Sequence, residues 1–313
     1  MNKIKKIAII GTGVIGAGWI IRCLAHDKIV YAFDKDLKLK KNLVSEIKRT
    51  WPHVKKLFNK KTLKLKNFKY FTSLEEAVKD ADFIQECASE NYALKTRLMA
   101  TIGKYAKPKA IISSSSSGLL PTKIYSKCKN PQRTIIGHPF NPVYLLPAVE
   151  IVPGKKTSNE YLDNAKKFYK SISMNPIMVK HELPGYLSDR LQEALWREGL
   201  HIINEGHATT EDLDRAIEDG PGLRWSLMGT FLTFHLAGGK AGMRHMLEQF
   251  GPALKLPWTK LKAPNLSKKL INRLVAGTKK QSKGKSVTKI ANIRDEYLVE
   301  LQKLRKKYEK KLR

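Results

Sequence analysis

The stretch Ile7–Gly16, which reads IAIIGTGVIG, decides the fold of this chain. Its apolar half predicts a buried strand that runs through a glycine-rich turn into an apolar helix. In a dinucleotide-binding turn the first glycine permits the tight bend, the second lets the backbone approach a pyrophosphate, and the third lets helix and strand pack closely. The helix N-terminus adds free N–H groups and a positive dipole end. The predicted phosphate-binding residues are Gly11, Thr12, Gly13, Val14, Ile15 and Gly16.

A carboxylate at the end of the next strand indicates which dinucleotide is bound. Asp34 follows the apolar run Ile29–Phe33, 18 residues after Gly16. At that position a carboxylate can accept hydrogen bonds from the ribose hydroxyls, and it would repel a 2′-phosphate. The neighbouring cation of Lys35 could soften this discrimination, and Asp34 could instead cap a helix that starts near Leu37. We predict that the cofactor is NAD.

The rest of the N-terminal half alternates short apolar runs with helical stretches of about 10–15 residues, which is typical of a mostly parallel, doubly wound sheet. This pattern predicts a Rossmann-type α/β domain over residues 1–183. The predicted strands are Lys3–Ile10, Ile29–Phe33, Phe68–Phe71, Phe83–Cys87, Ala110–Ser114, Arg133–Gly137, Val149–Val152 and Ile177–Val179.

The pattern changes after Pro184-Gly185, where only helical periodicity remains. We therefore predict an all-α C-terminal domain over residues 184–313 that binds substrate and forms a dimer. Residues 276–286, rich in Gly, Ser and Lys, are predicted to be flexible, and Val287–Arg313 is predicted to form a charged terminal helix. From Lys268 onward the chain carries sixteen basic and four acidic residues, so this segment forms a basic tail.

Composition limits the classes of function. The formal net charge is +31, but 46 of the 59 basic residues are lysines scattered along the chain. Nucleic-acid readers favour arginine for its planar fork, so we interpret the lysines as a solvated surface and predict no nucleic-acid partner. The three cysteines have no disulfide or metal-binding spacing. No apolar stretch reaches membrane-spanning length. We expect a soluble cytoplasmic protein without a metal.

A second pattern carries candidate chemistry. His138-Pro139-Phe140-Asn141-Pro142 is followed by Glu150, and two strands flanking the connection could place the imidazole opposite the carboxylate. Oxidation of an alcohol needs a base for the hydroxyl proton, and a carboxylate on the other ring nitrogen fixes the tautomer. Ser117 and Asn141 could hold the substrate oxygen. A histidine and a glutamate twelve residues apart are, taken alone, more often ordinary core or surface residues.

These motifs resemble the L-3-hydroxyacyl-CoA dehydrogenase superfamily from about residue 4 to residue 260. The resemblance implies that His138 and Glu150 form a catalytic dyad, assisted by Ser117 and Asn141. It also implies that Glu90 and Lys95 lie near the nicotinamide side of the cofactor; the alternative for Lys95 is a solvated helix lysine. The resemblance rests on the glycine turn, the Ser-rich turn before Gly118-Leu119, the His-Pro-Phe-Asn-Pro motif, Val149-Glu150-Ile151 and Pro184-Gly185-Tyr186.

One difference from the acyl-CoA members of the superfamily limits the class of substrate. Acyl-CoA members carry Asn where this chain has Asp189, and several later segments resemble the L-carnitine dehydrogenase branch of the superfamily. That resemblance implies NAD-dependent oxidation of L-carnitine to 3-dehydrocarnitine by a homodimer, with His138 as general base. A related 3-hydroxy-acid dehydrogenase, acting on a 3-hydroxyacyl-CoA or on L-gulonate, is the alternative. The segments are Gly220–Trp225, Met228–Phe231, Ala241–His245, Gln249–Leu254 and Pro257–Leu261.

The chemistry of carnitine fits particular side chains. A trimethylammonium group donates no hydrogen bond, so aromatic faces and a carboxylate are its natural receptors. We predict that Asp189, Trp225 and Phe231 receive this cation, with Trp196, Phe234 and Tyr144 as further aromatic candidates. Arg224, or alternatively Arg244, is predicted to bind the substrate carboxylate. As alternatives, the aromatic side chains could belong to the core, and Asp189 could form a salt bridge at the domain boundary. A non-enzymatic protein that keeps the dehydrogenase fold is a further alternative.

Overall fold

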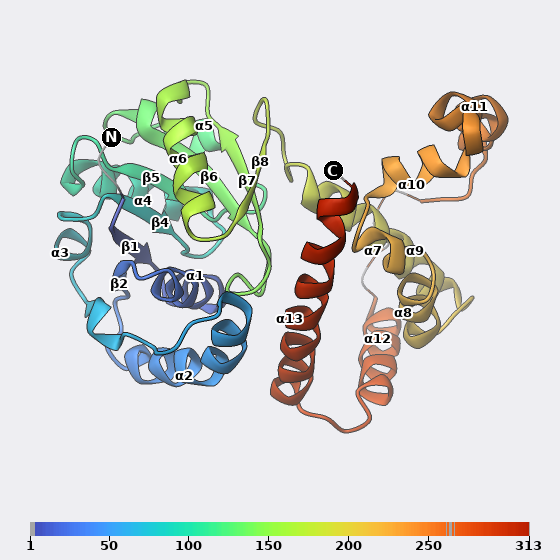
Figure 1. Cartoon of the computed structure of the whole chain (residues 1–313), viewed down its shortest axis with the longest axis horizontal. Coiled ribbons are helices and arrows are strands. Elements are labelled where there is room, and N and C mark those ends of the chain that lie inside the picture. The colour runs from blue at the N-terminus through green and yellow to red at the C-terminus, as the bar shows by residue number, and fades with distance from the viewer. Residues whose placement is uncertain (1–3, 261, 263–264, 266, 313) are drawn as a thin grey trace. The chain divides into compact units, whose positions relative to one another are not determined.

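The computed structural model describes residues 4–260, 262, 265 and 267–312. The chain divides into two compact units, Met1–Arg190 and Leu191–Arg313 (Figure 1). The first unit contains all the strands described below, and the second is helical. None of the helices in the described part of the chain combines the length and the apolar character needed to cross a bilayer.

The described part of the first unit forms an eight-stranded sheet in the order β3-β2-β1-β4-β5-β6-β7-β8. All neighbouring strands pair in parallel except β6 and β7, which are antiparallel. The strand order reverses at β1, where open α/β sheets bind dinucleotides. The predicted mostly parallel sheet is confirmed. The strands are β1 Lys6–Ile10, β2 Ile29–Phe33, β3 Phe68–Phe71, β4 Phe83–Glu86, β5 Ile111–Ser114, β6 Thr134–Pro139, β7 Ala148–Pro153 and β8 Asn175–Met178.

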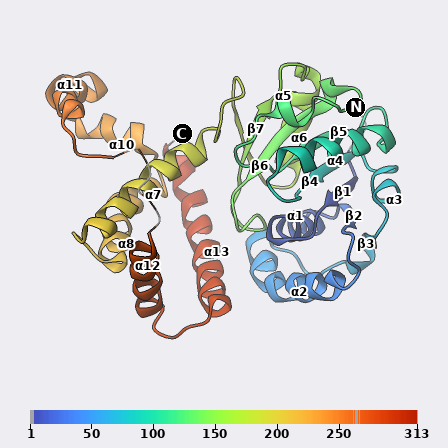
Figure 2. The same ribbon diagram turned by 180° about the vertical axis from the view of Figure 1, so that it is seen from behind.

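Helices cover both faces of this sheet; α6 lies in front in Figure 1 and α4 lies in front when the molecule is turned (Figure 2). On one face Ile84 and Ile112 share a buried cluster with Met99 of α4. On the other face Phe83 stacks on Phe168 of α6, with ring centroids 4.1 Å apart. The helices of this unit are α1 Val14–Ala25, α2 Leu39–Phe58, α3 Leu74–Val78, α4 Tyr92–Tyr105, α5 Pro121–Ile124 and α6 Asn159–Ser171.

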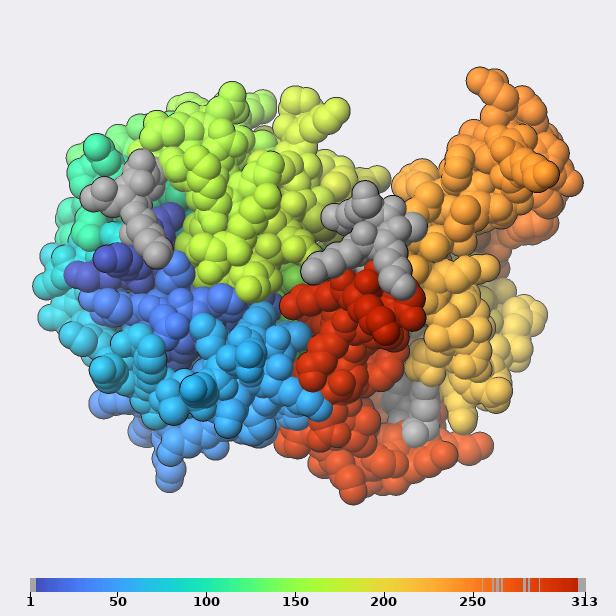
Figure 3. Space-filling view, viewed as in Figure 1, coloured from blue at the N-terminus to red at the C-terminus, as the bar shows by residue number. Residues whose placement is uncertain are grey.

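The second unit confirms the predicted all-α domain, and within it α10 and α11 project from the other helices (Figure 3). The predicted flexible segment 276–286 is wrong in its first part, because α12 continues to Gln281. Gly277 accounts for the error: a Cβ there would lie 2.5 Å from Thr210 Oγ1, so this glycine allows close packing of α12 on α8. The helices are α7 Ser188–Glu205, α8 Thr210–Glu218, α9 Pro221–Trp225, α10 Thr230–Ala237, α11 Gly242–Phe250, α12 Lys268–Gln281 and α13 Val287–Leu312.

Candidate active site

The glycine turn between β1 and α1 has the geometry that a dinucleotide requires. Gly11 adopts φ +99°, in the left-handed region, and a Cβ on Gly16 would lie only 1.9 Å from the Gly11 carbonyl oxygen. At Gly13, in contrast, a Cβ would meet no described atom within 4 Å beyond its chain neighbours, so the backbone is open to a ligand. Val14, the first residue of α1, is also exposed. This turn therefore fits the pyrophosphate of NAD at the N-terminus of α1.

Asp34 is held against this turn. Its Oδ2 accepts hydrogen bonds from the backbone N–H of Thr12 at 3.0 Å and from Thr12 Oγ1 at 2.9 Å. The helix that follows, α2, begins at Leu39 with Lys38 as its cap residue, so the alternative that Asp34 caps this helix is wrong. Thr12 occupies only one carboxylate oxygen in these contacts, which leaves Asp34 Oδ1 for a ribose hydroxyl.

The antiparallel pairing of β6 and β7 places His138 directly opposite Glu150. His138 Nδ1 lies 2.8 Å from Glu150 Oε2, and both side chains are buried. The other carboxylate oxygen, Glu150 Oε1, accepts hydrogen bonds from the backbone N–H groups of Leu187 at 3.0 Å and Ser188 at 2.9 Å. Every oxygen of this buried carboxylate therefore has a donor.

The start of α7 supplies those two N–H groups. Just before it, Gly185 has φ +71° and Tyr186 has φ +44°, so the chain passes through two left-handed residues before it enters the helix. Burial by itself would raise the pKa of Glu150, but the hydrogen bonds from His138, Ser188 and Leu187 outweigh it and hold the pKa below its usual value. Glu150 is therefore a carboxylate that accepts the Nδ1–H proton, which places the lone pair of a neutral His138 imidazole on Nε2.

A second carboxylate lies near Nε2 of His138. Asp189 Oδ1 lies 3.9 Å from His138 Nε2, on the opposite side of the ring from Glu150. The rings of Phe140 and Tyr186 lie beside the imidazole, at centroid distances of 5.6 and 5.8 Å. The imidazole of His138 thus has two aromatic rings beside it and the Asp189 carboxylate near Nε2.

The remaining predicted residues of the first unit lie on nearby connections. Asn141 is exposed in the connection between β6 and β7, three residues after His138. Ser117 follows β5, and its backbone N–H donates to Glu90 Oε1 at 3.1 Å. Among the described residues no hydrogen bond joins the side chain of Ser117 or Asn141 to His138, so their contact with substrate stays a prediction.

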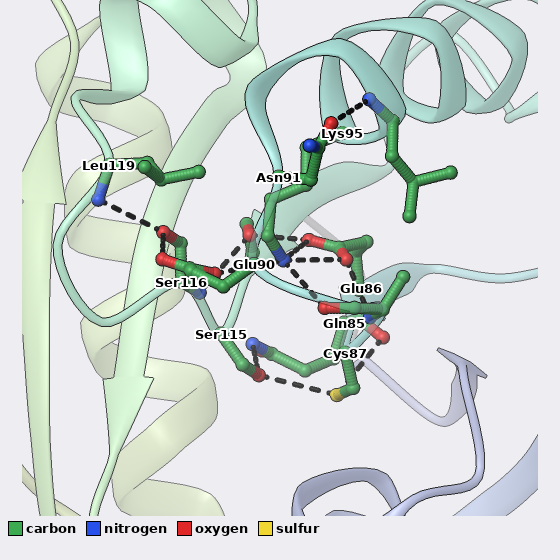
Figure 4. A network of polar contacts seen from close by, with 12 residues as sticks. Gln85, Glu86, Cys87, Glu90, Asn91, Lys95, Ser115, Ser116 and Leu119 are labelled. Atoms are coloured by element: carbon green, nitrogen blue, oxygen red, sulfur yellow. Dashed lines mark hydrogen bonds and ion pairs between the residues drawn. The ribbon is translucent and has the colours of Figure 1, made fainter.

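Lys95 is not a solvated lysine, since its side chain is only 1% exposed. Its Nζ lies 2.8 and 3.0 Å from the two oxygens of Glu86, 2.9 Å from the Ala88 carbonyl oxygen and 3.4 Å from Glu90 Oε2. Figure 4 shows how Glu86 and Glu90 converge in this network. The side chain of Glu90 is 39% exposed, so the network reaches from the core to the surface.

Glu86 was missed by sequence reasoning. It is the last residue of β4, it is fully buried, and it accepts a 2.5 Å hydrogen bond from Ser114 Oγ of β5. Ser116 makes the corresponding bond to Glu90 Oε1, also at 2.5 Å (Figure 4). A charged residue within the predicted strand Phe83–Cys87 is the signal that could have identified Glu86, because a buried carboxylate requires a cation or several donors.

The three predicted substrate residues of the second unit lie on α9 and α10. Arg224 and Trp225 end α9, and Phe231 is the second residue of α10. All three side chains are exposed, Phe231 by 81%. The alternative that Trp225 and Phe231 belong to the core is therefore wrong, and their role at the substrate stays a prediction.

The hydrogen bonds of Glu150 make stability depend on pH. A carboxylate whose folded pKa lies below its unfolded value of about 4.3 stabilises the fold above that value. This contribution is lost as the pH falls through the folded pKa. We expect the free energy of unfolding of the wild type to exceed that of Glu150→Gln at pH 7 and to approach it steadily below about pH 5. Urea unfolding of both proteins between pH 7 and pH 3 tests this; a difference independent of pH would contradict it.

A dinucleotide-binding turn and a buried histidine–carboxylate pair in one Rossmann-type unit define an NAD-dependent oxidoreductase. Residues 6–182 match the NAD binding domain of 3-hydroxyacyl-CoA dehydrogenase, and residues 185–286 match the C-terminal domain of the same family. The chain belongs to the 3-hydroxyacyl-CoA dehydrogenase family.

Two kinds of comparison accompany this family assignment: relatives of similar sequence, and a solved structure of similar fold. The L-carnitine dehydrogenase of Bacillus cereus is 50% identical over 98% of this chain and 94% of that protein, and the one of Pseudomonas putida is 50% identical over 96% and 93%. Among solved structures, the NAD⁺-dependent 5-formyl-3-hydroxy-2-methylpyridine 4-carboxylic acid 5-dehydrogenase has a TM-score of 0.81 at 21% identity, over 97% of this chain and 99% of that chain. The latter similarity concerns the fold.

Proposed function

We propose that this enzyme oxidises L-carnitine to 3-dehydrocarnitine with NAD. The observation that carries the proposal is the position of Asp189, 3.9 Å from His138 Nε2. In carnitine the hydroxyl carbon is bonded to the carbon that bears the trimethylammonium group. A hydroxyl at His138 Nε2 therefore brings the cation within reach of the Asp189 carboxylate, where opposite charges attract. The two L-carnitine dehydrogenases of similar sequence support the same substrate.

The proton chemistry follows from the His138–Glu150 pair. Because Nδ1–H is donated to Glu150, Nε2 accepts the proton of the substrate hydroxyl as the C–H bond at C3 breaks. The carbon–oxygen bond becomes a ketone, and the Glu150 carboxylate stabilises the resulting imidazolium. Bound NAD would supply the acceptor for the hydride that leaves C3. Ser117 and Asn141 are proposed to hold the reacting oxygen, and Glu90 and Lys95 are proposed to line the nicotinamide side.

Three exposed residues of the second unit are proposed to bind substrate. Trp225 and Phe231 offer exposed aromatic faces of the kind that bind quaternary ammonium groups. Arg224 offers a guanidinium that can bind the substrate carboxylate through two parallel hydrogen bonds. We propose the residue ranges 1–183 and 184–313 for the two functional domains.

Asp189→Asn tests the substrate assignment, because it removes the charge and keeps the shape. At about 4 Å an ion pair near a protein surface contributes about 1–4 kcal/mol. We expect the variant to raise the KM for L-carnitine by about 10–100-fold, with a smaller effect on kcat. The matched substrate is the neutral analogue in which carbon replaces the ammonium nitrogen, and its kcat/KM should change little. Steady-state assays of NADH formation measure both.

Comparison with other 3-hydroxy acids decides the substrate class. The wild type should turn over L-carnitine in preference to a 3-hydroxyacyl-CoA and to L-gulonate. Turnover of the acyl-CoA without turnover of carnitine would overturn the proposal. Equal losses for carnitine and its neutral analogue in Asp189→Asn would remove Asp189 from cation recognition.

We also propose a cytoplasmic homodimer. The three cysteines are free thiols, which suits a reducing compartment. The α10–α11 pair of the second unit presents large exposed apolar side chains, and such patches on soluble proteins mark association surfaces. Sedimentation velocity of the wild type should therefore give about twice the mass of one chain, and a monomer would contradict this. The exposed side chains are Phe234 and Leu236 of α10, Leu247 and Phe250 of α11, and Leu254 shortly after α11.

A further inference from the structure

Arg22, on the cofactor-binding helix α1, is fully buried, and the hydrogen bonds that the structure describes for it go only to main-chain oxygens, while its guanidinium lies 5.3 Å from the ring centroid of Phe58. Its guanidinium donates to the carbonyls of Val143 at 2.6 Å, Leu146 at 2.9 Å, Ile172 at 3.1 Å and Ser173 at 2.9 Å. Val143 and Leu146 belong to the connection that begins with Phe140 and Asn141. A planar fork that satisfies four acceptors fixes this connection in direction as well as in distance.

Direct packing accompanies these hydrogen bonds. Gly18, one turn before Arg22, lies so close to the same connection that a Cβ would be 2.8 Å from Val143 Cβ. The backbone of α1 at Gly18 therefore packs directly against the Val143 side chain of the segment after His138. A change in the position of one must be accommodated by the other, because protein interiors are close-packed.

The same helix also reaches the residue before His138. Trp19 Nε1 donates to Ser115 Oγ at 3.0 Å, and Ser115 Oγ accepts from Gln85 Nε2 at 2.7 Å (Figure 4 shows Gln85 and Ser115). Gln85 Nε2 also donates to the Gly137 carbonyl at 3.2 Å, and Gln85 Oε1 accepts from Tyr169 at 2.7 Å. Gln85 is buried, so its hydrogen bonds are protected from water.

Trp19 and Arg22 thus connect α1 to the His138 segment on both sides of the histidine. We propose that Arg22 is a positioning residue, supported by Trp19, that fixes the His138–Asn141 segment relative to the cofactor-binding turn at the start of α1. The inference rests on the proposed roles of His138 and Asn141. Hydride transfer requires the alcohol carbon close to the nicotinamide, and a shift of about 1 Å can cost about 100-fold in rate.

Arg22→Lys is the test, and Arg133→Lys is its matched control. Arg133 is equally buried, and it too donates to main-chain carbonyls, those of Gly103, Lys107 and Ala110, which lie away from the His138–Asn141 segment. Each substitution keeps a positive charge and loses the planar fork. Both variants should therefore lose comparable stability in urea unfolding, while only Arg22→Lys should disturb the site.

We expect Arg22→Lys to lower kcat for L-carnitine by about 10–100-fold, with the Kd of NAD within about twofold of the wild type. Arg133→Lys should keep the kcat of the wild type. A second readout needs no substrate: the downfield proton resonance of His138 Nδ1–H, assigned by its loss in His138→Gln, should shift or broaden in Arg22→Lys and stay unchanged in Arg133→Lys. If Arg22→Lys does not fold, Trp19→Phe, which removes the Ser115 hydrogen bond together with part of the buried ring, should give a several-fold loss of kcat.

Two outcomes would overturn the inference. The first is a folded Arg22→Lys with the kcat and the His138 resonance of the wild type. The second is the same loss of kcat in Arg133→Lys. Absence of carnitine turnover in the wild type would overturn the proposed function instead, and the His138 resonance would then decide the role of Arg22.

Discussion

His138→Gln is expected to lower kcat by about 10³-fold or more while the Kd of NAD stays within about twofold. A positioned general base contributes about 10²–10⁴-fold, and glutamine can donate to Glu150 but cannot accept a proton at the reacting oxygen. The glycine turn and Asp34 lie outside this change, so cofactor binding should survive. The rate of NADH formation at saturating substrate and fluorescence titration with NAD measure the two quantities.

His181→Gln is the matched control, since His181 is an exposed histidine of the same unit. It should leave kcat unchanged. A kcat for His138→Gln within threefold of the wild type would remove His138 from the reaction. Loss of both NAD binding and kcat would show instead that the substitution disturbs the fold of the unit. The kcat and the Kd of NAD of Glu150→Gln would then separate an effect on catalysis from an effect on folding.

Sequence predicts those parts of the site whose residues lie close together along the chain. The glycine turn depends on the positive φ of Gly11 and on the close approach of Gly16 to Gly11, and these local requirements can be read from glycine spacing. The His138–Glu150 pair is different, because a separation of twelve residues has no meaning until β6 and β7 pair in antiparallel register. The family resemblance supplied what spacing could not.

The parts that sequence misses depend on distant segments. Arg22 looks like a surface residue of a helix, but the connections at residues 143–146 and 172–173 fold over it and supply its acceptors. The N–H groups that complete Glu150 come from residues 187 and 188, in the turn that enters α7. No local sequence pattern predicts such contacts, because they form only after elements that are distant in the sequence have packed together.

The buried Lys95–Glu86 pair shows the same dependence and predicts the largest effect on stability. Lys95 lies on α4, and Glu86 ends β4. Lys95→Met would leave the Glu86 carboxylate buried, with hydrogen bonds from Ser114 and from the backbone N–H of Ala88 as its remaining described contacts. Removing one partner of a buried ion pair typically costs about 3–5 kcal/mol in the free energy of unfolding. Urea unfolding at pH 7 measures this loss.

Lys107→Met is the matched control, because Lys107 binds Asp82 in a pair whose side chains are 40% and 32% exposed. Solvated pairs contribute about 0–1 kcal/mol, so the control should lose little. The double variant Lys95→Met/Glu86→Gln should recover part of the loss, since the unpaired charge is gone while the amide can keep the neighbouring hydrogen bonds. A loss below about 1 kcal/mol in Lys95→Met would mean that water reaches Glu86 and that burial does not determine the strength of this pair.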